Sequence, residues 1–192
     1  ADTRSRIAST TKIMTGLLAC EMLALDAEYT VPTEAVGIEG SSLYLKAGEQ
    51  LTVRALLYGL LLHSGNDAAV ALALAHSGTV EAFVKAMNER ARELGLRDTH
   101  FTNPNGLDAP EHYSTALDLA RLTRAALQVP AFAEVVATRQ ITLEGRSFTN
   151  HNRLLWLLDG AIGVKTGYTR AAGRTLVSAA ERNGRRLIAV TL

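Results

Sequence analysis

Cysteine, lysine and long hydrophobic runs are all scarce in this sequence. Among 192 residues Cys20 is the only cysteine, which excludes an internal disulfide framework and a paired-cysteine metal or redox motif. The longest apolar run, residues 55–62, is far shorter than the roughly 18 residues that a membrane-spanning helix needs. The formal net charge of +1 gives no reason to expect a nucleic acid or an anionic membrane as a partner. The composition, 47% hydrophobic and 20% charged, is that of a globular protein long enough to bury a core.

The two ends of the sequence also lack features. There is no initiator methionine and no signal peptide, and the last segment, RRLIAVTL, stops in what reads as the middle of a strand. No internal repeat or low-complexity linker divides the chain. We therefore expect an excerpt of a longer protein, in which the missing targeting segments say nothing about location.

Lysine is the rarer cation, with four residues against 16 arginines. Because a lysine can lose its proton when it is desolvated and an arginine does not, a lysine among apolar residues is a candidate base. Lys12 stands in the apolar start of a helix expected over residues 9–25, where burial and the helix N-terminus both lower the pKa of an amine. Ser9 lies one turn earlier on the same face, where a neutral Lys12 could activate it as a nucleophile. The plainer alternative is that Ser9 caps the helix and Lys12 reaches solvent.

Two further short motifs bear on this choice. Ser64-Gly65-Asn66 interrupts two apolar helices, and its polar groups would be satisfied if they lined a cleft. Lys165-Thr166-Gly167 comes just before a C-terminal hairpin, where a cation, a hydroxyl and a glycine at a strand edge suit a ligand with a carboxylate. Taken alone, the first could equally be an ordinary turn between helices, and the second a surface turn.

Hydrophobic spacing divides the rest of the chain into helices and then strands. Apolar residues recur at helical spacing in the middle of the chain, and the period changes after Thr138. The dipeptide Asn183-Gly184 indicates a tight turn between two C-terminal strands. We expect helices over residues 52–62, 67–76 and 80–94, a helix capped by Ser114 that runs to about residue 127, another that begins at Pro130, and hairpins over residues 139–149 and 174–192. Helices in the middle and a sheet at the end indicate an α+β or a two-lobed α/β protein.

The three motifs Ser-x-x-Lys, Ser-Gly-Asn and Lys-Thr-Gly, in this order, resemble those of the low-molecular-mass penicillin-binding proteins, the serine D-alanyl-D-alanine carboxypeptidases. The resemblance covers nearly the whole chain and includes IASTTKIMT, GSSLYLKAGEQLTVRALLYGLLLHSGNDAAVALA, HFTNPNGLD, YSTALDLARLTRAAL, NHNRLLW and GVKTGYT. It implies the two-lobed α/β fold of serine β-lactamases and transpeptidases, with a helical lobe and an antiparallel sheet. We expect one catalytic domain over residues 1–192, truncated at both ends, with a helical lobe at about 13–137 and a remnant of the sheet lobe at about 161–192.

The resemblance also implies a chemistry without a cofactor. The substrate would be a peptidoglycan stem peptide that ends in D-Ala-D-Ala, and β-lactams would inhibit by acylating the same serine. The implied catalytic residues are Ser9 as nucleophile, Lys12 as base, and Ser64 as the group that helps return a proton to the departing D-Ala. The implied binding residues are Asn66 for a substrate amide, Lys165 and Thr166 for the terminal carboxylate, Gly167 for close approach of the peptide, and the N–H groups of Ser9 and Tyr168 for the oxyanion hole. We expect no metal, because the five histidines show no ligand spacing.

Two alternatives stay open: a β-lactamase of the same architecture, and a penicillin-sensing domain that is acylated without turnover. Class A β-lactamases deacylate with a glutamate in an E-x-x-L-N segment, and no glutamate between Asn66 and Lys165 begins that pattern. We therefore favour the carboxypeptidase. This interpretation implies an extracytoplasmic location in a bacterium, no nucleic-acid partner, and membrane contact only through a segment absent from this chain.

Overall fold

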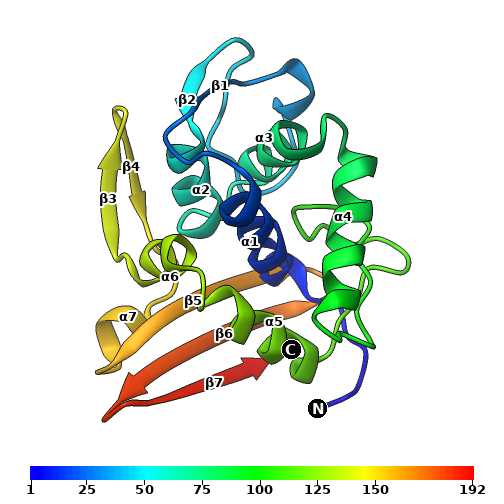
Figure 1. Cartoon of the computed structure of the whole chain (residues 1–192), viewed down its shortest axis with the longest axis vertical. Helices are drawn as coiled ribbons and strands as arrows, with labels where there is room; N and C mark the ends of the chain where they lie inside the picture. The colour runs from blue at the N-terminus through cyan, green and yellow to red at the C-terminus, as the bar shows by residue number, and fades with distance from the viewer.

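Helices and sheet are segregated along the chain, as the sequence predicts (Figure 1). The computed structural model describes all residues from Ala1 to Leu192. Its α-helices are α1 (Lys12–Met22), α2 (Val53–Leu61), α3 (Asn66–Ser77), α4 (Val80–Glu93), α5 (Ala116–Ala126), α6 (Pro130–Ala137) and α7 (Leu154–Leu157), and two short 3-10 helices are η1 (Ala8–Thr11) and η2 (Thr33–Ala35). Its strands are β1 (Glu28–Thr30), β2 (Gln50–Thr52), β3 (Gln140–Leu143), β4 (Arg146–Thr149), β5 (Ala161–Thr169), β6 (Gly173–Arg182) and β7 (Arg185–Thr191).

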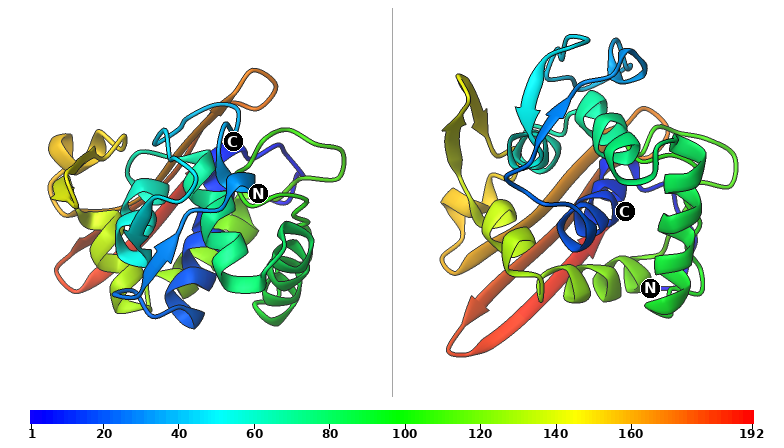
Figure 2. Two further views of the ribbon diagram at one scale, coloured as in Figure 1. Left: turned by 90° about the horizontal axis from the view of Figure 1, so that it is seen from above. Right: turned by 45° about the horizontal axis from the view of Figure 1, so that its top comes forward.

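Helix α1 is the central element of the helical layer, and both views of Figure 2 show it among the other helices. All residues from Lys12 to Ala19 are buried, so the helix has no solvent face over that length. It contacts α2 to α6 and strand β5. One cluster of 41 buried apolar side chains continues from α1 into the sheet at Val164 and Val177, so the two layers share a core. The start of α1 is therefore held on every side.

The sequence predicts a helix that begins at Ser9, but the α-helix begins at Lys12. Residues from Ala8 to Thr11 form the 3-10 turn η1 instead, because Ala8 has a left-handed φ of 46°. The hydroxyls of Thr10 and Thr11 donate to the carbonyls of Ile7 and Ala8, at 2.6 and 2.8 Å, and these local bonds favour the tighter turn over an α-helix. The helix also ends earlier, at Met22 rather than at residue 25.

The main sheet has the strand order β5-β6-β7 and is antiparallel throughout. Asn183 and Gly184 join β6 to β7 with φ angles of 50° and 72°, the left-handed values that a two-residue hairpin turn requires. This predicted turn is confirmed. Because β6 lies in the middle, β5 is an edge strand, and it carries Lys165-Thr166-Gly167. Helices α5 and α6 and the turn η1 pack against this sheet.

Most of the other predicted elements are confirmed, with shifts at their ends. Thr52 caps α2 by accepting from the N–H of Ala55 at 3.1 Å, and the β3–β4 hairpin lies where the sequence predicts it. The prediction that Ser114 caps α5 is wrong by one residue. Thr115 is the cap, since its hydroxyl accepts from the N–H of Asp118, while the backbone of Ser114 pairs with Ser5. The short pair β1–β2 was not predicted.

No single helix is long and apolar enough to cross a membrane. Only α3 and α4 taken together are long and apolar enough, and a bend of 84° separates them.

Candidate active site

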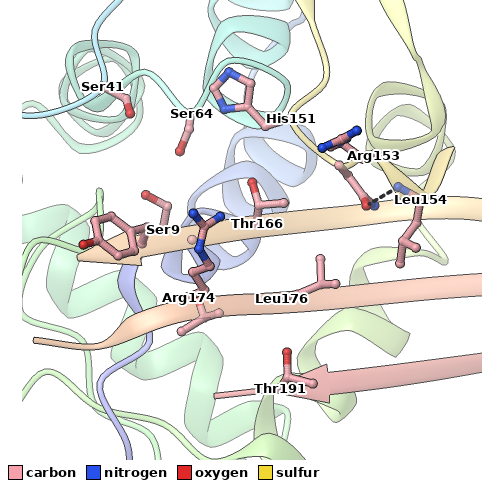
Figure 3. Close-up of a pocket in the computed structure, with 14 residues that line it drawn as sticks. Ser9, Ser41, Ser64, His151, Arg153, Leu154, Thr166, Arg174, Leu176 and Thr191 are labelled. Atoms are coloured by element: carbon pink, nitrogen blue, oxygen red, sulfur yellow. Dashed lines mark hydrogen bonds between the residues drawn. The ribbon is translucent and has the colours of Figure 1, made fainter. Parts of the chain in front are cut away.

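The three motifs meet at one cavity between the helical layer and the edge strand β5 (Figure 3). The cavity has a volume of about 600 Å³. Its lining includes Ser9 from η1, Ser64 from the turn between α2 and α3, and Thr166, Gly167 and Tyr168 from β5. Lys12, Asn66 and Lys165 lie directly behind this lining, where they are buried and contact it.

Lys12 is fully buried, with its amine surrounded by three oxygens. Nζ lies 3.0 Å from Ser9 Oγ, and it donates to Asn66 Oδ1 and to the carbonyl of Asn105, each at 2.6 Å. Burial lowers the pKa of Lys12 well below its ordinary value, and the charge of Lys165 lowers it further, while Asp67 opposes both. The sequence-based expectation of a desolvated lysine one turn from a serine is therefore matched by the geometry.

The neighbouring hydrogen bonds determine how a neutral Lys12 is oriented. Asn66 donates through Nδ2 to the carbonyl of Glu39 at 2.6 Å, so its Oδ1 is the acceptor that faces Lys12. The carbonyl of Asn105 can only accept. These two acceptors use both N–H groups of a neutral amine, and the lone pair then faces Ser9 Oγ. The arrangement suits an amine that takes the proton of Ser9.

Ser64 and Lys165 form a second hydroxyl–amine pair in the same site. Lys165 Nζ donates to Ser64 Oγ at 3.1 Å and to the carbonyl of Thr166 at 2.8 Å. Lys165 is only 1% exposed, and burial lowers its pKa to about 7. Ser64 has a φ of 66°, which turns the chain sharply between α2 and α3 and brings its hydroxyl into the cavity. At neutral pH this amine can exist in both protonation states, as a proton-transfer group requires.

Gly167 is required by a close approach inside the protein. A Cβ at this position would collide with Thr175 Oγ1 and would lie 2.9 Å from the backbone nitrogen of Ser9. Strand β5 therefore runs directly against the turn η1 that carries Ser9. The neighbouring Tyr168 is 66% exposed at the mouth of the cavity. This contact brings the backbone of the third motif next to that of the first.

A profile of the D-alanyl-D-alanine carboxypeptidase family matches residues 1–192. The chain belongs to this family. It is 39% identical over 193 residues to the D-alanyl-D-alanine carboxypeptidase DacF of Bacillus subtilis, covering 95% of this chain and 50% of that protein. It is 40% identical over 200 residues to DacD of Escherichia coli, covering 96% and 51%. The chain thus spans about half the length of these curated relatives.

Solved structures of the carboxypeptidase family have the same fold as this chain. A Streptomyces DD-transpeptidase is 38% identical and superposes with a TM-score of 0.94, covering 99% of this chain and 81% of that one. The D-alanyl-D-alanine carboxypeptidase DacD of Francisella tularensis is 33% identical with a TM-score of 0.92, covering 98% and 60%. The resemblance inferred from the three motifs is confirmed, and so is the two-lobed α/β fold of helices and antiparallel sheet.

Several residues of this family member's site were not predicted from the sequence. The loop at residues 103–106 reads only as a turn, yet its Asn105 supplies an acceptor for Lys12. Asp67 accepts from Ser42 Oγ at 2.7 Å and from the backbone N–H groups of Leu43 and Leu45, and thereby holds the segment that places Ser41 at the cavity. An acidic residue directly after a Ser-Gly-Asn break was a usable signal for such a role, because it lies at a helix N-terminus.

Two arginine side chains also line the cavity, and none of the three sequence motifs predicts them. Arg174 on β6 is the cross-strand partner of Tyr168, and Figure 3 shows its guanidinium directed toward the space between Ser9 and Thr166. Arg153 lies on the opposite side of the opening. No aspartate or glutamate lines the cavity. No three histidine, cysteine or carboxylate side chains lie together as a metal ion would need.

Proposed function

We propose that this chain is the catalytic domain of a serine D-alanyl-D-alanine carboxypeptidase. Its reaction removes the terminal D-Ala from peptidoglycan stem peptides through an acyl-enzyme on Ser9, and β-lactams acylate the same serine. The observation that carries the proposal is the buried Lys12 amine, 3.0 Å from Ser9 Oγ and with a pKa held well below its ordinary value. The domain is proposed to extend over residues 1–192, with the helical lobe and the sheet on either side of the cavity.

Acylation begins with transfer of the Ser9 proton to Lys12. The neutral amine accepts it while Asn66 Oδ1 and the carbonyl of Asn105 keep its other protons in place. Ser9 Oγ then bonds to the carbonyl carbon of the penultimate D-Ala, and the peptide C–N bond breaks. The departing nitrogen takes a proton from the Ser64 hydroxyl, and Lys165 then donates a proton to Ser64 Oγ. Lys165 can do so because its pKa of about 7 leaves a fraction of this amine protonated near neutral pH. A water molecule then hydrolyses the ester: its oxygen bonds to the acyl carbon as the bond to Ser9 Oγ breaks, and one of its protons restores the Ser9 hydroxyl. Lys12 releases the proton that it took, and Lys165 regains the one that it gave, which completes the cycle.

The oxyanion of the tetrahedral intermediate is proposed to lie between the backbone N–H groups of Ser9 and Tyr168. Close packing at Gly167 supports this, since it brings β5 against the turn that carries Ser9. A substrate extended along the free edge of β5 would present its carbonyl at that point. Such preorganised donors commonly contribute about 10² to 10³ in rate.

The terminal carboxylate of the substrate is proposed to bind Thr166 and Arg174, both of which line the cavity. Lys165 contributes its charge from behind the wall, because its amine is committed to Ser64 and to the carbonyl of Thr166. In the same way, Asn66 is proposed to act first on Lys12. A contact between Asn66 and a substrate amide would require Nδ2 to leave the carbonyl of Glu39.

Release of D-Ala from a peptide ending in D-Ala-D-Ala, measured on the full-length natural protein, tests this function. We expect turnover by the wild type and none by Ser9→Ala. Steady hydrolysis of a β-lactam without peptide turnover would instead identify a β-lactamase, and acylation with no turnover of either would identify a penicillin sensor. The substrate places the proposed enzyme outside the bacterial cytoplasm, which cell fractionation can check.

A further inference from the structure

A buried histidine lies behind the turn that carries Ser9 and is outside all three motifs. His112 is 4% exposed and follows the loop that contains Asn105 and Gly106. Its ring packs edge-on against Phe101, and both of its nitrogens have hydrogen-bond partners. The proposed reaction does not use it. Its partners connect it to the backbone immediately before Ser9.

The direction of each hydrogen bond in this connection is determined by backbone groups. The N–H of Thr102, which can only donate, points at His112 Nδ1 at 3.0 Å, so Nδ1 carries no proton. The neutral ring therefore has its proton on Nε2, which donates to Thr11 Oγ1 at 2.8 Å. Thr11 Oγ1 in turn donates to the carbonyl of Ala8, also at 2.8 Å. This series of hydrogen bonds runs from Thr102 through His112 and Thr11 to Ala8.

The last residue in this series of hydrogen bonds, Ala8, has a strained backbone and directly precedes Ser9. Ala8 is buried and has a φ of 46°, a conformation that a residue with a Cβ adopts only when its surroundings enforce it. Gly106 packs on the same peptide: a Cβ there would lie 2.5 Å from the carbonyl carbon of Ala8 and 2.9 Å from Thr11 Oγ1. The carbonyl of Ala8 is thus held by the Thr11 hydroxyl and by the backbone of the loop.

The same loop also holds the amine. Asn105 accepts from Lys12, and the carbonyl of Pro104 accepts from Thr15 on α1 at 2.6 Å. One segment therefore contacts Lys12 directly, through Asn105, and packs through Gly106 on Ala8, the residue before Ser9. Because proton transfer depends steeply on the separation of the two groups, a shift of this segment changes the rate more than it changes substrate binding.

We propose that His112 is a positioning residue, which holds Ser9 Oγ at its reactive distance from Lys12 through the hydrogen bonds from Nε2 to Thr11 and from Thr11 to the Ala8 carbonyl. This rests on the proposed function, in which Lys12 takes the proton of Ser9. The role requires the uncharged ring with its proton on Nε2. Burial lowers the pKa of His112 to about 4, so the ring is uncharged near neutral pH.

Matched substitutions at Thr11 test the proposal with little change in volume. Thr11→Val keeps the shape and removes the hydroxyl, whereas Thr11→Ser keeps the hydroxyl. In the full-length protein, we expect Thr11→Val to lower the acylation rate constant for benzylpenicillin by about tenfold or more, with the pre-covalent binding constant changed less than about threefold. Thr11→Ser should retain a rate constant within about threefold of the wild type. His76→Gln, which alters a histidine on α3 that bonds Ser77 and packs on Phe83, away from this series of hydrogen bonds, is the control.

Two results would overturn the proposal. One is an unchanged acylation rate constant in a folded Thr11→Val, and the other is a loss in Thr11→Ser as large as that in Thr11→Val. A measurement on the wild type needs no variant to fold: nitrogen NMR of labelled histidine should show Nε2 of His112 protonated and Nδ1 unprotonated at neutral pH, and a charged ring or the opposite tautomer would contradict the mechanism. If the wild type is neither acylated nor able to release D-Ala, the proposed function fails, whereas a normal wild type with an undisturbed Thr11→Val refutes this inference alone.

Discussion

Acid should destabilise this fold through His112, and the size of the effect follows from its surroundings. The side chain is 4% exposed, and burial lowers its pKa from 6.5 to about 4. The nearby His100 contributes a smaller part of this lowering, and Asp108 opposes it. Protonation would also place two donors face to face, at His112 Nδ1 and the N–H of Thr102.

The unfolded chain takes up the proton of this histidine more readily than the folded chain does. The stabilisation is therefore fully present above about pH 6.5 and is lost as the pH falls toward about 4. The difference between a pKa of 6.5 in the unfolded chain and about 4 in the folded chain corresponds to about 3 kcal/mol over the whole window, of which about 2 kcal/mol is lost between about pH 7 and pH 5. His76 and His151, whose pKa values are also lowered by burial, act in the same direction.

Urea unfolding of the wild type and of His112→Gln at several pH values isolates the contribution of His112. The substitution changes the stability by a constant amount at every pH and also removes the titrating group. Between about pH 7 and pH 5, we expect the free energy of unfolding of the wild type to decrease by about 2 kcal/mol more than that of the variant does. Parallel curves for the two proteins would refute the argument, because they would show that the folded protein accommodates a charged His112.

The remaining predictions concern the cavity. Lys12→Arg keeps the charge but cannot supply a neutral amine, so acylation should fall by about 10² to 10⁴-fold in stopped-flow assays, and near-normal acylation would exclude Lys12 as the base. Arg174→Leu should raise KM for a D-Ala-D-Ala peptide by about tenfold with a smaller change in kcat, while an unchanged KM would remove Arg174 from carboxylate binding. Because no carboxylate lines the cavity to activate water beside a tethered leaving group, a chromogenic cephalosporin should give a burst of about one equivalent and then little further hydrolysis. Sustained turnover at or above about 10 s⁻¹ would indicate a β-lactamase instead.

Local spacing was enough to predict the pair at the start of α1. Ser9 and Lys12 are three residues apart, so any helical turn brings them to one face. The form of the turn could not be predicted in the same way. It is a 3-10 turn because Ala8 is held in a left-handed conformation by contacts with Gly106, almost a hundred residues away in the sequence. The helix propensities of residues near Ser9 carry no information about a contact with such a distant residue.

Two of the contacts that the sequence did not predict are long-range. The Lys165–Ser64 and Lys12–Asn105 bonds join residues that are 101 and 93 positions apart, and no periodic pattern reports such pairs. Arg174 is an intermediate case. Its position follows from the register of β5 and β6, in which it faces Tyr168, and the register depends on a turn over residues 170–172 that has no strong turn signal.

Peptide mapping by mass spectrometry tests the central claim, that Ser9 is the nucleophile, most directly. The full-length protein is incubated with benzylpenicillin, digested, and searched for the modified residue. The account predicts one adduct per molecule, located on Ser9, with none in Ser9→Ala. An adduct on any other residue, including Ser64, or undiminished labelling of Ser9→Ala, would contradict it.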